Sequence, residues 1–264
     1  MKNIILKYLL IILIISTSCK DIETADKILH KTIGTIDTIE TVYYKQDMIR
    51  TNPKNIDETI FRYREMHFQR LINDSIVGVK GHWYFYNEDK TMVIYEDIYD
   101  GNKLIRKNNR DSLAMVFDLI KHPEFKEKHF WSHNTPFTLQ YMFKYTLDNN
   151  EYYQTDRLND TIIQDTNCYQ ISIRLEDKQT MPGFAIKLED SKGSISTTLL
   201  FINKQNYYPI RIVTKNYSKE NPERKFFVDQ TYYDFKFNKN INEDVQFNTS
   251  DDILTGFKTN ERKP

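Results

Sequence analysis

The histidines are the side chains whose types and spacing come nearest to a metal site. His129 and His133 stand four residues apart, so a short helix would place both imidazoles on one face, with His122 and Glu124 upstream. Two such imidazoles can form part of a zinc site. No HExxH pattern surrounds them, and the residues between them supply no general base. A zinc-dependent hydrolase is therefore the least favoured hypothesis, and solvated or packing histidines between two helices are the preferred interpretation.

The remaining reactive side chains form no catalytic pattern. Cys168 falls on the polar parity of a predicted strand, and a lone half-buried thiol is far more often inert than nucleophilic. The carboxylate pairs Glu243-Asp244 and Asp251-Asp252 fall in turns or in the C-terminal tail, where solvation explains them. No GxSxG, Walker or dinucleotide-binding fingerprint occurs. The sequence therefore predicts a protein that is not an enzyme and that uses no cofactor and no metal.

The composition argues against several classes of partner. The 264 residues carry 37 basic and 37 acidic side chains, without a long block of one sign. Nucleic acids and anionic membrane surfaces need clustered Lys and Arg, so neither is expected to hold this chain electrostatically. Seven Gly and seven Pro against 18 Tyr and 16 Phe argue against disorder and predict a folded body rich in β-structure.

The N-terminal segment has the pattern of an export signal. Two lysines flank or precede the apolar run Tyr8–Ile15, and small polar residues lead to Cys19. The run is shorter than the about 20 residues that span a bilayer, so residues 1–18 are predicted to be a signal peptide. A Cys after small residues resembles the lipobox of bacterial lipoproteins, in which the thiol is acylated, although Ser16 replaces the usual Leu, Val or Ile. We expect lipidation at Cys19; a conventional signal peptide with an incidental thiol is the alternative.

Processing at Cys19 would give a nearly neutral exported chain. Removing residues 1–18 takes two lysines and no acids, which leaves 35 basic and 37 acidic groups. With residues 19–21 as the lipidated N-terminus, Cys168 is the remaining thiol and no CxxC exists, so no disulfide is expected. The polar residues after Cys19 loosely resemble the export tag of surface-exposed Bacteroidetes lipoproteins. The expected location is the outer membrane, on its periplasmic side or at the cell surface.

Hydrophobic periodicity predicts a helix followed by an antiparallel meander. The helix is expected over Ala25–Ile33, after which the apolar period changes to two and polar turns separate the segments. The apolar side chains of Thr59–Ile72 change parity halfway, which predicts a bulge near Arg64-Glu65. The strands predicted for this meander are Thr38–Arg50, Thr59–Ile72, Val77–Tyr86, Met92–Tyr99 and Lys103–Lys107.

Two apolar helices and a second meander are predicted for the rest of the chain. Ser112–Lys121 carries an apolar stripe, and Phe137–Thr146 is apolar nearly all round, so both helices must be covered or must cover something themselves. Residues 248–264 are polar and are expected to form a frayed tail. One domain is therefore expected over residues 22–247. The strands predicted for the second meander are 169–176, 184–189, 196–203, 208–212 and 225–237.

The order of these elements is similar to the superfamily of outer-membrane lipoprotein carriers and receptors, the LolA/LolB-like fold. Among its members the chain looks most like the version fused ahead of a thioredoxin domain in many Bacteroidetes proteins, without that second domain. Several short strings resemble the strand and turn segments of the family. These strings are Tyr99-Asp100-Gly101-Asn102-Lys103, Asp160-Thr161-Ile162-Ile163, Cys168-Tyr169-Gln170-Ile171, Leu200-Phe201-Ile202-Asn203-Lys204, Tyr208-Pro209-Ile210-Arg211 and Tyr232-Tyr233-Asp234-Phe235, with Asn240 and Phe247 after them.

The resemblance implies an α+β fold, mainly antiparallel β, in which a curved incomplete β-barrel holds a hydrophobic ligand under lidding helices. The function expected is that of a monomeric, membrane-anchored carrier, receptor or sensor of a lipid, an acyl chain or a lipid-modified protein. One alternative is a protein-docking adaptor of the same fold, as in its anti-sigma-factor regulators; another is a solid domain in which the helices are ordinary core. The residues predicted to line the hollow are Phe61, Tyr63, Phe68, Trp83, Phe85, Tyr95, Val116, Phe117, Ile120, Phe137 and Tyr141.

Overall fold

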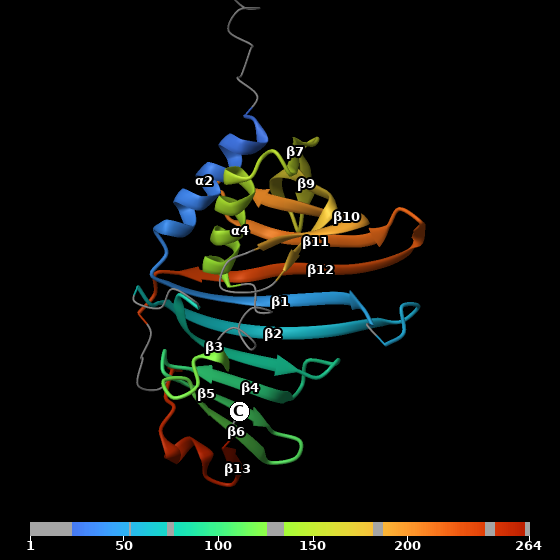
Figure 1. Cartoon of the computed structure of the whole chain (residues 1–264). Coiled ribbons are helices and arrows are strands. Elements are labelled where there is room, and N and C mark those ends of the chain that lie inside the picture. Colours follow the sequence, from blue (N-terminus) through green and yellow to red (C-terminus); the bar gives the residue numbers. More distant parts are fainter. Residues whose placement is uncertain are drawn as a thin grey trace, which may run out of the picture.

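One curved sheet forms the body of the chain in the computed structural model (Figure 1). The structure describes residues 23–52, 54–72, 77–125, 135–181, 187–240 and 246–261. The strands are β1 (Thr41–Thr51), β2 (Thr59–Arg70), β3 (Val79–Tyr86), β4 (Val93–Tyr99), β5 (Lys103–Asn108), β6 (Leu113–Asp118), β7 (Tyr153–Arg157), β8 (Thr161–Ile163), β9 (Thr166–Met181), β10 (Lys187–Asn203), β11 (Pro209–Ser218), β12 (Asn221–Phe237) and β13 (Lys258–Glu261).

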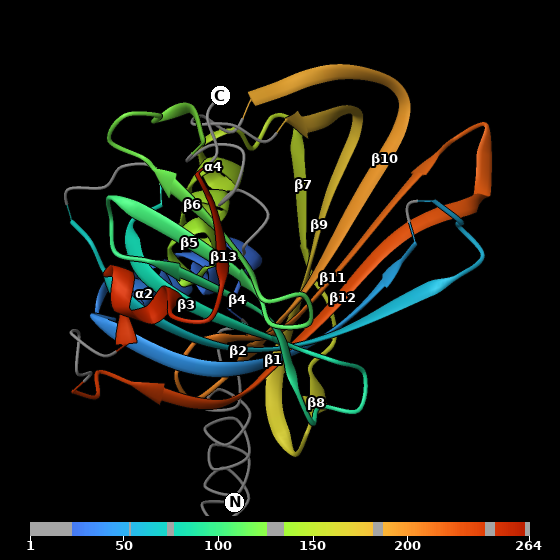
Figure 2. The same ribbon diagram turned by 90° about the horizontal axis from the view of Figure 1, so that it is seen from below.

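The sheet is an open half-barrel. Its strand order is β13-β6-β5-β4-β3-β2-β1-β12-β11-β10-β9-β7, with β8 paired to β9, and β7 and β13 do not pair with each other among the described residues. Among the described strands, every pair of neighbours is antiparallel except β6 with β13. The helices α2 (Ala25–Asp37) and α4 (Pro136–Asp148) lie inside the curve (Figure 2). The predicted incomplete barrel of mainly antiparallel strands is confirmed.

Both helices begin where the sequence predicts. Thr24 caps α2 and Thr135 caps α4, and each threonine side chain accepts a hydrogen bond from a backbone N–H in the first turn. Helix α2 runs to Asp37, beyond the predicted end at Ile33, and its buried stripe packs into the core. In the described residues, no helix is both long enough and apolar enough to cross a bilayer.

The segment Ser112–Lys121 is a strand, so the helix predicted there is wrong. Leu113–Asp118 forms β6, which pairs with β5 on one side and with β13 on the other. Ala114 and Phe117 are buried, as they would also be on a helix face. A short apolar run fits both periods, and here the strand partners supplied by the rest of the chain decide the outcome.

The expectation of a frayed tail over residues 248–264 also needs correction. Asp251–Leu254 forms a 3₁₀ turn, and β13 then adds a parallel strand beside β6. The backbone N–H of Lys258 donates to the carbonyl of Ser112 over 2.8 Å. Backbone hydrogen bonds hold this segment against β6. Because such bonds do not depend on apolar side chains, the sequence shows no hydrophobic pattern there.

Strand β2 pairs with both neighbours without a register shift, so the bulge predicted near Arg64-Glu65 is wrong. Its even-numbered side chains, from Arg62 to Met66, share the concave face, and Tyr63 faces the other side. The apparent change of parity arises because polar side chains occupy part of the concave face. The change of parity among the apolar residues is therefore compatible with a regular strand.

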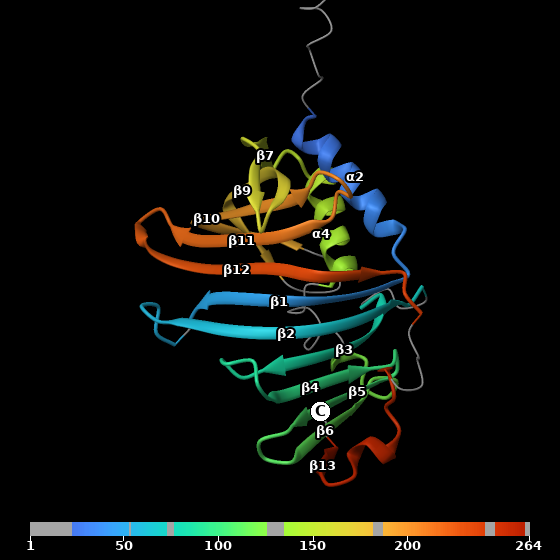
Figure 3. The ribbon, with the colours of Figure 1, turned by 180° about the vertical axis from the view of Figure 1, so that it is seen from behind.

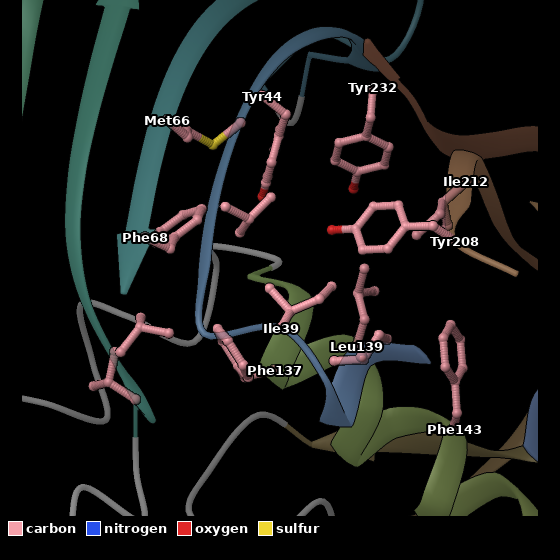
Figure 4. Packing of buried hydrophobic residues seen from close by; sticks show 14 of the residues in the cluster. Ile39, Tyr44, Met66, Phe68, Phe137, Leu139, Phe143, Tyr208, Ile212 and Tyr232 are labelled. Carbon is pink, nitrogen blue, oxygen red and sulfur yellow. The ribbon is translucent and has the colours of Figure 1, made fainter. Parts of the chain in front are cut away.

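The core fills the half-barrel at the end where α2 lies. The buried tyrosines Tyr44, Tyr208 and Tyr232 point their hydroxyl groups toward one another above Leu139 and Phe143 of α4 (Figure 4). The hairpin tips of β1–β2 and β11–β12 lie at the opposite end of the molecule (Figure 3). The two ends of the half-barrel therefore differ, because the described helices pack at one end and long hairpins extend at the other.

The convex face carries a half-buried imidazole that makes stability depend on pH. Burial lowers the pKa of His67 from 6.5 to about 4, and the ring contacts Tyr43 at a centroid distance of 4.6 Å. The unfolded chain then binds more protons than the folded chain at acidic pH, so the stability present above the unfolded pKa is lost as pH falls. We expect the free energy of unfolding to drop by roughly 2 kcal/mol between about pH 6.5 and 4 through His67.

Urea unfolding at a series of pH values measures this dependence. The His67→Gln variant should show a flatter decline than the wild-type chain over that range, because glutamine does not titrate. Equal slopes for the two chains would show that folding does not lower the pKa of His67.

Candidate ligand-binding groove

The concave face holds a large open groove at the hairpin end of the half-barrel. Its volume is about 1210 Å³, which exceeds the about 300–1,000 Å³ of pockets that hold drug-sized ligands. Strands β1 to β5 form one wall and β9 to β12 form the other. Thr138 and Met142 of α4 contribute to the lining, so the helix borders the groove.

Polarity increases from the core toward the hairpin tips along each central strand. On β1 the concave positions run from buried Tyr44 through Gln46 and Met48 to Arg50. On β2 they run from Phe68 through Met66 to the arginines, and cross-strand register places Gln46 opposite Arg64. Because successive side chains alternate between faces, every second residue adds one layer to this gradient.

A hydrogen-bonded layer separates the core from the groove. The amide of Gln46 donates to Oε1 of Gln230 over 2.8 Å, and Nη1 of Arg64 donates to Oε1 of Gln46 over 3.3 Å. All three side chains are buried. The layer therefore fixes the Arg64 guanidinium at the inner end of the groove, over the ring of Phe85 at 5.1 Å.

Three arginines of the groove have no carboxylate partner in the described part of the chain. Among the described residues, no acidic side chain forms an ion pair with Arg50, Arg62 or Arg64, and the buried Nε atoms of Arg50 and Arg64 have no hydrogen-bond partner. Burial, with Arg62 nearby, lowers the pKa of Arg64 to about 10; burial, with Arg50 nearby, lowers the pKa of Arg62. We name Arg50, Arg62 and Arg64 the arginine cluster.

Two other cations of the groove, Arg106 and Lys178, are paired with carboxylates. Arg106 donates two hydrogen bonds to Asp97, from Nε over 2.8 Å and from Nη2 over 2.6 Å. Lys178 contacts Asp190 over 2.9 Å. Asp97 is the one carboxylate in the described lining, against six cationic side chains. The groove is therefore strongly positive although the whole chain has zero formal charge.

A smaller apolar pocket continues the groove beneath α4. It measures about 100 Å³ and lies between Leu139 and Phe143 of the helix and Ile173, Leu200 and Ile212 of the sheet. The pocket and the groove share four lining residues, which join them under the helix. These residues are Met142, Ser196, Thr198 and Thr214.

The residues predicted to line the hollow are spread over several environments. Phe85 and Tyr95 lie on the groove wall. Four others are buried in the core: Phe68, Trp83, Phe117 and Phe137. Three are exposed: Phe61, Ile120 and Tyr141. Tyr63 and Val116 are half-buried, outside the described groove lining.

Sequence reasoning missed the arginine cluster. The available signal was the change of parity in β2, where Arg62 and Arg64 occupy positions whose neighbours Met66 and Phe68 are buried. A charged residue among the buried positions of an alternating strand can be explained by a bulge, but it can equally be explained by a polar cavity.

The structure gives no support to the reactive groups considered first. His122 contacts Glu124 over 3.4 Å, and His129 and His133 lie outside the described residues. No cluster of three metal-binding side chains occurs in the part of the chain that the structure describes. Cys168 is fully buried beside Phe201, and burial raises the pKa of its thiol, which disfavours the reactive thiolate.

Comparison with known proteins finds likeness in structure alone. No protein-family model matches the sequence, and no curated protein matches it. The lipoprotein LppX of Mycobacterium tuberculosis has a TM-score of 0.46 at 8% identity, covering 83% of this chain and 97% of LppX. A LolA superfamily protein of Nitrosomonas europaea has a TM-score of 0.33 at 10% identity, covering 84% and 97%.

MucB, in the MucA/MucB complex of Pseudomonas aeruginosa, has a TM-score of 0.45 at 7% identity, covering 83% of this chain and 59% of the other. These likenesses concern the fold.

Proposed function

We propose that this chain is an exported lipoprotein, anchored by an acylated Cys19, that binds a hydrophobic or amphiphilic ligand as a carrier, receptor or sensor. The observation that carries the proposal is the open groove that continues into the apolar pocket beneath α4. A filled core would leave no such space, because protein interiors pack with few voids larger than a water molecule. The described half-barrel thus offers both an entrance and an apolar interior.

The proposed anchor would hold the domain close to a membrane. Five residues separate Cys19 from Ala25, the first residue of α2. An extended chain spans at most about 3.6 Å per residue, so the start of α2 would lie within roughly 20 Å of the acylated residue. A lipid would then need to travel only a short distance between the bilayer and the groove.

A variant that blocks the junction between groove and pocket tests the binding proposal. Thr198 lies at the junction, and its hydroxyl pairs with that of Thr214 at 3.2 Å. Thr198→Trp should fill the junction and remove a co-purifying lipid, because the indole would occupy the space of the acyl chain. The measurement is mass spectrometry of organic extracts of the full chain purified in dodecyl maltoside.

The neighbouring threonine supplies the matched control. Thr197 precedes Thr198 on β10 and, by strand alternation, faces the opposite side of the sheet, so Thr197→Trp should retain the lipid. A wild-type chain without lipid, or a Thr198→Trp chain with an unchanged amount, would contradict the proposal. Circular dichroism of both variants checks that they fold.

A second candidate function is a protein-docking adaptor. Apolar side chains are exposed around the edge strand β7 and in β8, namely Tyr152, Leu158 and Ile162. An edge strand can accept an extended peptide from a partner. A polypeptide that co-purifies stoichiometrically with both tryptophan variants would favour this function over lipid binding.

A further inference from the structure

We propose that the groove selects amphiphiles with an anionic headgroup, which the arginine cluster binds while the tail enters the apolar pocket beneath α4. This inference rests on the proposed function and adds the class of ligand. Its basis is that the arginine cluster, which forms no ion pair with a described carboxylate, and the apolar pocket lie in one continuous space.

The arginine cluster lies on one patch of the concave face. Arg62 and Arg64 are two residues apart on β2, which puts their Cα atoms about 7 Å apart on the same face. Arg50 of β1 pairs with Ile60, so it is the diagonal neighbour of Arg62 across the strand pair. An oxyanion placed between the three side chains could accept hydrogen bonds from more than one guanidinium.

The charges of the cluster call for an anion that the described chain does not supply. Burial and the repulsion of neighbouring arginines both lower the pKa values of Arg62 and Arg64, so holding these charges in the groove costs free energy. The buried Nε–H groups of Arg50 and Arg64 have no acceptor among the described residues. A bound carboxylate or phosphate would neutralise the repulsion and accept these donors.

The positions of the arginines also orient the ligand. Arg64 stands at the inner layer beside Gln46, and Arg50 and Arg62 stand farther toward the hairpin tips. Apolar side chains from both walls, including Met48 and Ile195, lie between charged positions. The shared residues Thr198 and Met142 connect this space to the apolar pocket. The headgroup would therefore lie in the groove, with the tail directed beneath α4.

Two amphiphiles with the same tail test the role of charge. Dodecyl phosphate is an anionic monoester, whereas dodecylphosphocholine is a phosphate diester whose single negative charge is balanced by a quaternary ammonium. We expect the full chain, held in dodecyl maltoside, to bind dodecyl phosphate at least about tenfold more tightly in isothermal titration calorimetry. The affinity should weaken as salt is added, because ions screen the attraction.

Variants assign the selectivity to the cluster. The double variant Arg62→Gln/Arg64→Gln should lose the difference between the two amphiphiles. Arg110→Gln, which removes the same charge from the exposed turn between β5 and β6, should keep it. Thermal unfolding of both variants verifies that they are folded. Should the double variant fail to fold, Arg62→Gln alone at the groove mouth provides the same comparison.

Each other outcome has a definite meaning. Equal affinity of the wild-type chain for both amphiphiles would overturn the charge selectivity and leave the proposed function standing. Binding of neither would count against the proposed function itself. Displacement of dodecyl phosphate by equimolar inorganic phosphate would show a site for a soluble anion and would overturn the assignment to amphiphiles.

Discussion

The Arg64→Met variant is expected to be more stable than the wild-type chain by about 1–3 kcal/mol, because it removes a buried cation for which no described residue forms an ion pair. Burial lowers the pKa of Arg64 to about 10, so the guanidinium stays charged at neutral pH and the folded chain bears the cost of removing this charge from water. Methionine has a similar length and retains the packing against Phe85. The change also leaves Oε1 of Gln46 without this donor, which offsets part of the gain.

Urea unfolding at neutral pH, without added ligand, measures this effect. The control is Arg110→Met at an exposed position, which should change the free energy of unfolding by less than about 0.5 kcal/mol. Equal or lower stability of Arg64→Met would show that the wild-type groove stabilises this cation. Adding dodecyl phosphate should narrow the difference, since a bound anion stabilises the folded wild-type chain selectively.

The expected gain in stability suggests that Arg64 serves binding and does not serve folding. A buried charge that lowers stability persists in a folded chain when it serves a purpose that stability alone does not provide. In this groove, the purpose that fits the neighbouring arginines is the binding of an anion. The same substitution should therefore raise stability and weaken binding, two effects that a purely structural residue would not combine.

Much of the fold could be predicted because local signals agree with it. Alternating apolar residues predicted most strands, and the capping threonines Thr24 and Thr135 marked the starts of α2 and α4. The strand β6 and the C-terminal β13 could not be predicted, because long-range pairing defines them. Their local patterns fit a helix and a tail equally well.

The candidate site was harder to predict than the fold. Aromatic residues serve both as core and as cavity wall, so composition could not separate Trp83, which is buried over Gly81, from Phe85 in the groove. The neutral net charge also hid the site. The arginines that converge in the groove belong to two strands, and the balancing carboxylates lie elsewhere, so only the register of β1 with β2 brings the charges together.

Asp97→Asn is expected to lower the free energy of unfolding by about 3 kcal/mol and, in the same chain, to strengthen anion binding. Asp97 is 2% exposed and accepts both hydrogen bonds of Arg106, whose side chain is 27% exposed. The asparagine would leave this guanidinium without a counter-charge beside the arginine cluster. The groove would then hold no described carboxylate, and its affinity for dodecyl phosphate should rise by about three- to tenfold.

A second pair in the sheet separates the general effect of breaking such a bridge from the effect on the groove. Arg211 donates to Asp229 over 3.0 and 2.6 Å in the same two-bond geometry, and Asp229 is outside the groove lining, facing the other side of β12 from Gln230. Asp229→Asn should lower stability by about 1 kcal/mol, because this pair is more exposed, and should leave dodecyl phosphate affinity unchanged. Equal changes in affinity for the two variants would mean that overall charge, and not the arginine cluster, attracts the anion. A rise confined to Asp97→Asn would place the anion beside Arg106 and the arginine cluster, where we propose that the headgroup binds.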